Sequence, residues 1–204
     1  MARKLVEWQL IDPTNNLVFP WFTHPFLDVL KTWDLKDKYI LEYGGGRSTA
    51  WWANKAKWVT CIEAKDEYAF DIYDELEEHG LTAKSLVISD TDWTEGNRAI
   101  EQEYVRSHYN KLLDTDHLYH YDIVVVDGIF RYECMIEGIN LLSDRGGILI
   151  VDNWHQDGFL CPACEELVKD FEGEIFPQPG HTDHHGNCWK TAYFKIPPYA
   201  KGSF

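Results

Sequence analysis

The chain has 204 residues, a length that fits one domain or one domain with a short cap. Nineteen Lys and Arg against 34 Asp and Glu give a net charge of −15, which argues against nucleic acid and against an anionic membrane surface as principal partner. The hydrophobic content of 45% is that of a globular protein. Since no run of about 18 apolar residues occurs and the first residues lack a signal-peptide core, we expect a cytoplasmic protein without a membrane span.

The N-terminal part of the chain, residues 1–36, is expected to form a cap segment, and residues 37–204 the main domain. Aromatic residues crowd the stretch 20–26, and an amphipathic pattern follows it. This pattern predicts a cap helix with an aromatic entrance. We expect a ligand pocket behind this entrance, lined by the aromatic residues Trp21, Phe22, Trp93 and Trp154.

Short β-branched runs alternate with helical patterns in the middle of the chain. The runs predict strands over residues 39–43, 58–63, 85–89, 121–127 and 147–152. The intervening patterns predict helices over residues 66–78, 97–113 and 131–143. The first of these helices has the apolar stripe Ala69, Ile72, Tyr73 and Leu76, and the second has Ile100, Tyr104, Val105 and Leu112. This alternation favours βαβ crossovers and a doubly wound α/β sheet.

The C-terminal part has a different rhythm. A helix is expected from about residue 162 to 170, followed by a strand at 173–177, a polar loop at 178–188 and a strand at 189–196. Two strands joined by a loop without a helix form an antiparallel pair.

A glycine-rich segment follows the first predicted strand and reads Glu42-Tyr43-Gly44-Gly45-Gly46-Arg47-Ser48-Thr49. Glycines at such a turn let the backbone approach a ligand closely, and Ser48 and Thr49 can cap the next helix or donate to the ligand. The spacing does not match a Walker loop, and Thr49 occupies the place of the third glycine of a dinucleotide fingerprint. Glu42 suits a cationic group, such as an amino-acid ammonium.

Acidic residues end the next two strands. Glu63 lies 19 residues after Gly44, and a carboxylate at that place can accept two hydrogen bonds from a ribose diol, which favours a nucleoside ligand. Asp90 ends the third strand. It either receives the exocyclic amine of adenine, with Trp93 as a nearby wall, or forms an Asx turn.

Polar residues also follow the two most apolar strands: Asp127 after the fourth, and Asp152 with Asn153 after the fifth. Ligands bind at the carboxyl ends of strands in open α/β sheets, so these residues are candidates for the reacting neighbourhood. His155 is a candidate general base or a rim residue that only forms hydrogen bonds. Arg131, with Tyr132, either selects the substrate or merely opens a helix.

Together these features resemble the class I S-adenosylmethionine-dependent methyltransferases over roughly residues 37–196. The resemblance rests on Glu42-Tyr43-Gly44-Gly45-Gly46, on Glu63 and on the final hairpin, although Ser48 stands where many members carry a third glycine. It implies a doubly wound, Rossmann-like, mostly parallel seven-stranded sheet with an antiparallel C-terminal hairpin. It further implies that Glu42 and the glycines hold the methionine part, Glu63 the ribose, Asp90 the adenine, and that Asp127 lies near the sulfonium.

Two metal hypotheses accompany this resemblance. The segment Gly-Gly-Ile-Leu-Ile-Val-Asp-Asn is similar to that of metal-dependent small-molecule O-methyltransferases, in which two aspartates and an asparagine bind Mg²⁺. Here Asp127, Asp152 and Asn153 would bind a divalent cation, or only shape the pocket. The second hypothesis is that Cys161, Cys164 and Cys188 bind Zn²⁺ together with a nearby histidine. The alternative is that this segment forms a polar loop over the mouth of the site and binds no metal.

We therefore expect a methyltransferase that uses S-adenosylmethionine and acts on oxygen or nitrogen of a small molecule. A nicotinamide-dependent oxidoreductase and a non-catalytic nucleoside-binding module of the same fold are the alternatives.

Overall fold

The computed structural model describes residues 9–89, 98–113, 120–154, 162–182 and 188–198. Six helices lie in these residues: α1 (His24–Leu30), α2 (Arg47–Lys55), α3 (Asp66–Glu78), α4 (Arg98–Leu113), α5 (Arg131–Leu141) and α6 (Pro162–Val168), with a short 3-10 turn at Thr82–Lys84. The strands are β1 (Tyr39–Tyr43), β2 (Trp58–Glu63), β3 (Ser85–Ser89), β4 (Ile123–Val126), β5 (Gly147–Asp152), β6 (Glu172–Thr182) and β7 (Cys188–Ile196). In this part of the chain no helix is long and apolar enough to span a bilayer.

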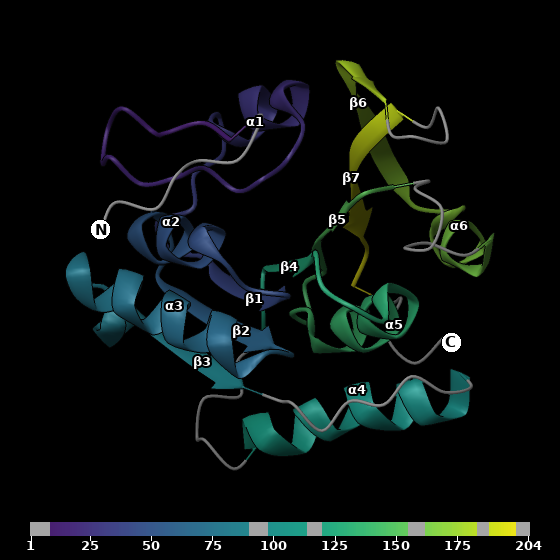
Figure 1. Cartoon of the computed structure of the whole chain (residues 1–204). Helices are drawn as coiled ribbons and strands as arrows, with labels where there is room; N and C mark the ends of the chain where they lie inside the picture. The colour runs from purple at the N-terminus through teal and green to yellow at the C-terminus, as the bar shows by residue number, and fades with distance from the viewer. Residues whose placement is uncertain (1–8, 90–97, 114–119, 155–161, 183–187, 199–204) are drawn as a thin grey trace.

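The seven strands form one sheet in the order β3-β2-β1-β4-β5-β7-β6 (Figure 1). The first five in this order pair in parallel, and β7 runs antiparallel to both β5 and β6. The expected doubly wound α/β sheet with an antiparallel C-terminal hairpin is confirmed. Because the carboxyl ends of β1, β2, β4 and β5 lie at one edge, the polar residues that follow them are brought together there.

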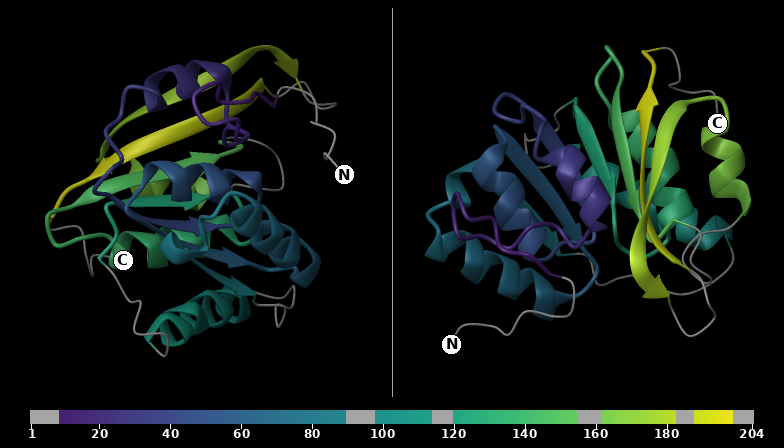
Figure 2. Two further views of the ribbon diagram at one scale, coloured as in Figure 1. Left: turned by 90° about the vertical axis from the view of Figure 1, so that its left-hand side faces the viewer. Right: turned by 90° about the horizontal axis from the view of Figure 1, so that it is seen from above.

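Helices cover both faces of the sheet, and each face has its own apolar core (Figure 2). One core joins α1, α2 and α3 through residues such as Phe26, Trp52 and Leu76. The other joins α4, α5 and α6, with Val105 and Ile139 among its members. Successive residues of the central strands alternate between the two cores, which is why these strands read as continuous apolar runs.

The N-terminal segment packs on the hairpin side of the sheet. The Thr23 backbone N–H donates to Thr191 Oγ1 at 3.0 Å, and the His24 N–H donates to Gln178 Oε1 at 2.7 Å. The Phe26 ring lies tilted against Phe176 of β6, with centroids 5.4 Å apart, and stacks on Tyr193 of β7 at 6.1 Å. Helix α1 is therefore built into the core. The division into a cap and a main domain stays a prediction.

Several boundaries and faces differ from expectation. Strand β6 extends to Thr182, where a loop was expected, because an edge strand tolerates Pro177, the nearby register shift and Gly180 at φ +77°. Tyr73 and Ile100, predicted on apolar stripes, are exposed. Of the predicted aromatic lining, Phe22 and Trp154 are buried in the cores, whereas Trp93 lies outside the described residues.

Candidate functional site

The glycine loop between β1 and α2 is shaped by the close approach of a second loop. Gly44 has φ +83°, and a Cβ added there would lie 2.4 Å from the backbone of Gly128, which follows β4. A Cβ on Gly45 would meet Cys61 Sγ at 2.2 Å. At Gly46 such an atom would meet nothing within 4 Å. Gly44 and Gly45 are thus required by packing, whereas Gly46 faces open space.

Glu42 lies beneath this loop and is only 1% exposed. Its carboxylate accepts hydrogen bonds from Ser48 Oγ and Thr49 Oγ1, each at 2.6 Å, and from Trp52 Nε1 at 3.1 Å. Thr49 Oγ1 in turn accepts the Gly46 N–H at 3.2 Å. Glu42 therefore ties the start of α2 to the end of β1. Glu42, Ser48 and Thr49 do not line the cavity described below, and their contact with a ligand stays a prediction.

Burial raises the pKa of Glu42 from 4.5 to about 7, although its three donors oppose the shift. The folded state then binds a proton more tightly than the unfolded state, so the folding stability should fall by about 3 kcal/mol as pH rises from about 4.5 to about 7. Glu42→Gln mimics the protonated side chain and should remove this decline. Urea unfolding of both proteins at several pH values measures the difference.

The exposed Glu78→Gln is the matched control and should keep the wild-type pH profile. Parallel stability curves for the wild type and Glu42→Gln would contradict the assignment of the decline to Glu42.

Glu63 ends β2 at the rim of the same loop. Its Oε2 accepts the Gly45 N–H at 2.9 Å, and its Oε1 accepts the Lys65 N–H at 3.0 Å. Burial raises the pKa of this carboxyl, and the backbone donors oppose the shift. A carboxylate has about four lone-pair sites, more than the backbone donors around Glu63 use, so Glu63 can still accept from a diol.

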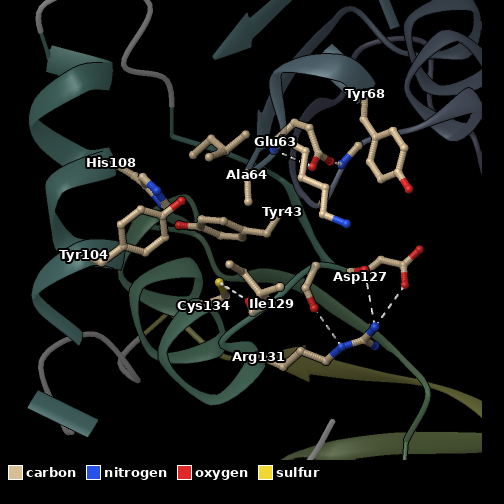
Figure 3. Close-up of a pocket in the computed structure, with 15 residues that line it drawn as sticks. Tyr43, Glu63, Ala64, Tyr68, Tyr104, His108, Asp127, Ile129, Arg131 and Cys134 are labelled. Atoms are coloured by element: carbon tan, nitrogen blue, oxygen red, sulfur yellow. Dashed lines mark hydrogen bonds and ion pairs between the residues drawn. The ribbon is translucent and has the colours of Figure 1, made fainter. Parts of the chain in front are cut away.

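A cavity of about 280 Å³ opens in front of these residues, near the lower end of the range for small-molecule sites, about 300 Å³. Figure 3 shows Glu63 and Asp127 on one side of it and the aromatic residues of α4 on the other. Its lining comes from β1 and β2 with the loops that follow them, from α3 and α4, and from the β4–α5 connection with the start of α5. The residues are Tyr43, Gly44, Gly45, Ile62, Glu63, Ala64, Lys65, Tyr68, Tyr104, His108, Asp127, Gly128, Ile129, Arg131 and Cys134.

The inner wall of this cavity is aromatic. Tyr43 was predicted as a cofactor-binding residue, whereas Tyr104 and His108 were not recognised in the sequence as site residues. The His108 ring lies edge-on to Tyr104 at 4.7 Å and is 6.1 Å from Tyr43 (Figure 3). The Tyr43 hydroxyl is buried and has no hydrogen-bond partner among the described residues. Tyr104 and His108 are one helical turn apart in α4, and that spacing was the available signal.

Tyr43→Phe should raise the free energy of unfolding of the ligand-free protein by about 1 kcal/mol, because it removes a buried hydroxyl without a partner. Chemical denaturation checks this. Tyr121→Phe is the control and should destabilise, since the Tyr121 hydroxyl donates to Thr60 Oγ1 at 3.0 Å. A destabilised Tyr43→Phe would show that the hydroxyl is satisfied in solution.

Asp127 follows β4 and reaches the cavity, with 28% of its side chain exposed. Its backbone N–H donates to the Tyr43 carbonyl at 2.9 Å, which fixes the chain at this point. Burial raises the pKa of Asp127, and the Arg131 guanidinium at 3.3 Å opposes the shift.

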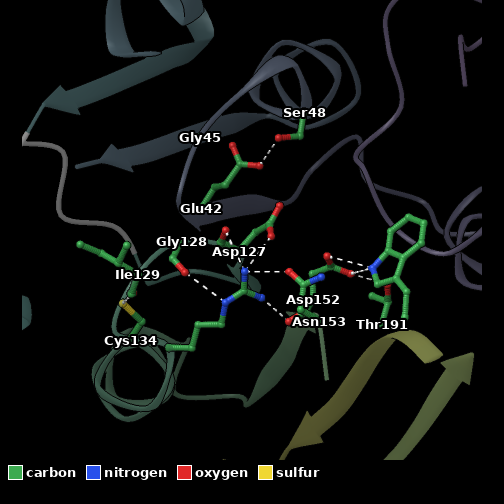
Figure 4. Close-up of polar contacts among 12 residues, drawn as sticks. Glu42, Gly45, Ser48, Asp127, Gly128, Ile129, Cys134, Asp152, Asn153 and Thr191 are labelled. Carbon is green, nitrogen blue, oxygen red and sulfur yellow. Dashed lines mark hydrogen bonds and ion pairs between the residues drawn. The ribbon is translucent and has the colours of Figure 1, made fainter. Parts of the chain in front are cut away.

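Asp152 ends β5 and is turned away from the cavity (Figure 4). Its Oδ1 accepts Thr191 Oγ1 at 2.6 Å, and both its oxygens lie 3.2 Å from Trp189 Nε1. Burial and the charge of Asp127 raise its pKa. Asn153 has φ +54°, a conformation that asparagine adopts more readily than most residues, and its amide oxygen faces Arg131.

The structure therefore brings the predicted site residues Tyr43, Gly44, Gly45, Glu63 and Asp127 to one cavity. The predicted residues Asp90, Trp93 and His155 lie outside the described residues. So does Cys161, whereas Cys164 is buried in a core and Cys188 Sγ donates to the Gln178 carbonyl. Within the described residues, no group of three or more His, Cys, Asp or Glu could hold a metal ion.

No protein-family profile and no curated protein matches the chain. Among solved structures it is similar to the O-methyltransferase TomG of Streptomyces achromogenes in complex with SAM, with 19% identity, 78% of this chain and 73% of that chain covered, and a TM-score of 0.53. It is also similar to the O-methyltransferase from Bacillus cereus in complex with SAH, with 16% identity, 78% of this chain and 74% of that chain covered, and a TM-score of 0.55. An rRNA methylase from Streptococcus thermophilus is similar as well, with 15% identity, 85% of this chain and 95% of that chain covered, and a TM-score of 0.58.

The chain has the class I methyltransferase fold. Its antiparallel β7 between β5 and β6 belongs to this shared architecture. The neighbours include enzymes named for both small-molecule and RNA methylation, so the methyltransferase fold by itself leaves the acceptor open.

Proposed function

We propose that this protein is an S-adenosylmethionine-dependent methyltransferase that acts on oxygen or nitrogen of a small molecule. One observation carries the proposal: the glycine loop, Glu63 and Asp127 line a single cavity at the carboxyl edge of the sheet. In open α/β folds this edge is where ligands bind.

The residues present suit this cofactor, which supplies a methyl group on a positively charged sulfur when bound. Open space lies in front of Gly46, where backbone can approach a ligand closely. Glu63 offers two acceptor oxygens to a ribose diol, and the carboxylate of Asp127 gives the cavity the charge that a sulfonium prefers. Asp90 and Trp93 complete the proposed cofactor site at the adenine.

Asp127 is the described carboxylate best placed to act near the reacting atoms. It reaches the cavity, whereas Asp152 is held by Trp189 and Thr191 and supports the site from behind. When the acceptor carries a proton, Asp127 would accept it while the acceptor atom bonds to the methyl carbon and the carbon–sulfur bond breaks, with S-adenosylhomocysteine as the leaving group. Asn153 orients this region, and His155 stays a proposed second base.

A small-molecule acceptor is favoured by charge. The net charge of −15 opposes a polyphosphate backbone. The cavity itself offers aromatic rings, with Tyr43, Tyr104 and His108 in its wall. Such rings suit a planar organic acceptor. A cytoplasmic location belongs to the same proposal.

Calorimetric titration with S-adenosylmethionine and S-adenosylhomocysteine tests the cofactor, and both should bind. Transfer of a radiolabelled methyl group into fractionated cell extract tests the reaction, and the label should enter the small-molecule fraction. Label in RNA would overturn the acceptor class. Binding of NADH in place of S-adenosylhomocysteine would favour an oxidoreductase, and cofactor binding without any labelled product would favour a non-catalytic module.

A further inference from the structure

The guanidinium of Arg131 contacts both the segment that follows β4 and the end of β5, and the residue is 4% exposed. Figure 4 labels its partners Asp127, Gly128, Asp152 and Asn153. Nε donates to the Gly128 carbonyl at 3.0 Å, and Nη1 donates to the Asp152 carbonyl. Nη2 lies 2.9 Å from Asn153 Oδ1 and 3.3 Å from both the carbonyl and the Oδ1 of Asp127. One buried cation thus joins the two strand ends.

These contacts use the oxygens that a divalent cation would need. Of the three side chains in the metal hypothesis, Asp127 and Asn153 already face the guanidinium. The third, Asp152, directs its carboxylate to β7, so the three do not converge on one point. The residues present therefore do not fit a Mg²⁺ site, which needs near-octahedral oxygen ligands.

The local backbone supports this arrangement. Two of the three non-glycine residues with positive φ in the described chain, Phe130 at +49° and Asn153 at +54°, directly flank the guanidinium and its partners. Asparagine adopts this conformation readily, whereas a phenylalanine keeps it only where surrounding contacts impose it. Here Phe130 directly precedes α5 and Asn153 directly follows β5, so both turns lie next to the guanidinium.

We propose that Arg131 is the resident cation of the site formed by Asp127 and Asn153, and that it takes the place of a divalent ion there. Guanidinium cannot lose its proton in a protein, so the positive charge is permanent. A second cation at the same oxygens would face both this charge and the loss of its ligands. Arg131 is then a positioning residue that holds Asp127 against the cavity wall. Metal-free methyl transfer is the consequence, and that part rests on the proposed function.

Mn²⁺ is the probe, followed by electron paramagnetic resonance of the free ion with the full chain. The wild type should leave the Mn²⁺ signal unchanged, and so should Arg131→Lys, which keeps a cation. Arg131→Ala frees the five oxygens of Asp127, Gly128, Asp152 and Asn153 that face the guanidinium, a set that does not include the Asp152 carboxylate. The variant should therefore bind Mn²⁺ with a Kd of about 10⁻³ M or tighter, as weak oxygen sites do. Adding Asp127→Asn to Arg131→Ala should abolish that binding.

The wild-type result stands even if Arg131→Ala fails to fold. Mn²⁺ uptake by the wild type that Asp127→Asn removes would overturn the proposal, and so would a folded Arg131→Ala that takes up no Mn²⁺. A purely structural arginine would not separate the Lys and Ala variants by metal uptake. Titration of the wild type with S-adenosylhomocysteine in EDTA and in Mg²⁺ should give equal affinities. Absence of any cofactor binding there would count against the proposed function alone.

Discussion

Gly44→Ala is expected to lower the free energy of unfolding by about 3 kcal/mol, which combines a left-handed backbone penalty with overpacking. Gly44 has φ +83°, and the added Cβ would lie 2.4 Å from two backbone atoms of Gly128. Backbone cannot move aside as a flexible side chain can, so the two loops would have to separate. Urea unfolding monitored by tryptophan fluorescence measures the loss.

Two glycines provide matched controls. Gly80 has φ +66° and open space around a Cβ, so Gly80→Ala should show the backbone penalty alone, about 1 kcal/mol. Gly46 has extended backbone and open space, so Gly46→Ala should leave stability nearly unchanged. If Gly44→Ala costs no more than Gly80→Ala, the close approach of the loops does not constrain this position.

Glu63→Gln is expected to weaken binding of S-adenosylhomocysteine by about ten- to a hundredfold, because hydrogen bonds to a charged group contribute roughly 1.5–3 kcal/mol. The variant keeps a carbonyl oxygen for one of the backbone N–H groups of Gly45 and Lys65 that the carboxylate now accepts. Calorimetric titration measures the change. The exposed Glu67→Gln, at the start of α3 and outside the cavity lining, should bind as the wild type does.

A 2′-deoxy analogue of S-adenosylhomocysteine separates ribose recognition from loop support. The wild type should bind this analogue more weakly than the parent compound, and Glu63→Gln should distinguish the two less. A variant that binds both ligands more weakly by the same factor retains the wild-type preference. That result would refute contact between Glu63 and the ribose and would assign Glu63 to support of the loop.

Much of the fold could be predicted because strand and helix periodicities are local properties. The pattern over residues 66–78 predicted α3 with its observed bounds, since a clear apolar stripe and flanking strands define it. The hairpin was predicted, but the length of β6 was not. Whether residues 178–182 extend as a strand depends on pairing near Cys188, which no local pattern records.

The candidate site was predicted as a set of strand ends, and less well as a set of contacts. Glu63 and Asp127 line the cavity, but Glu42 is enclosed by Ser48, Thr49 and Trp52. From the sequence, Arg131 was predicted either to select the substrate or to open a helix, and neither prediction included a buried cation. Such partners become visible only when two strand ends are placed side by side.

The sequence by itself determined the α/β class, the glycine turn and the acids that end the strands, because apolar period, glycine content and strand length act over a few neighbouring residues. Only the tertiary structure decided where each charged group points. Asp152 turns to Thr191, 39 residues away, and Arg131 reaches Asn153, 22 residues away. A buried charge needs a hydrogen-bonding or charged partner, since its desolvation is otherwise too costly. That partner is a residue brought close by the tertiary fold, which local sequence patterns do not reveal.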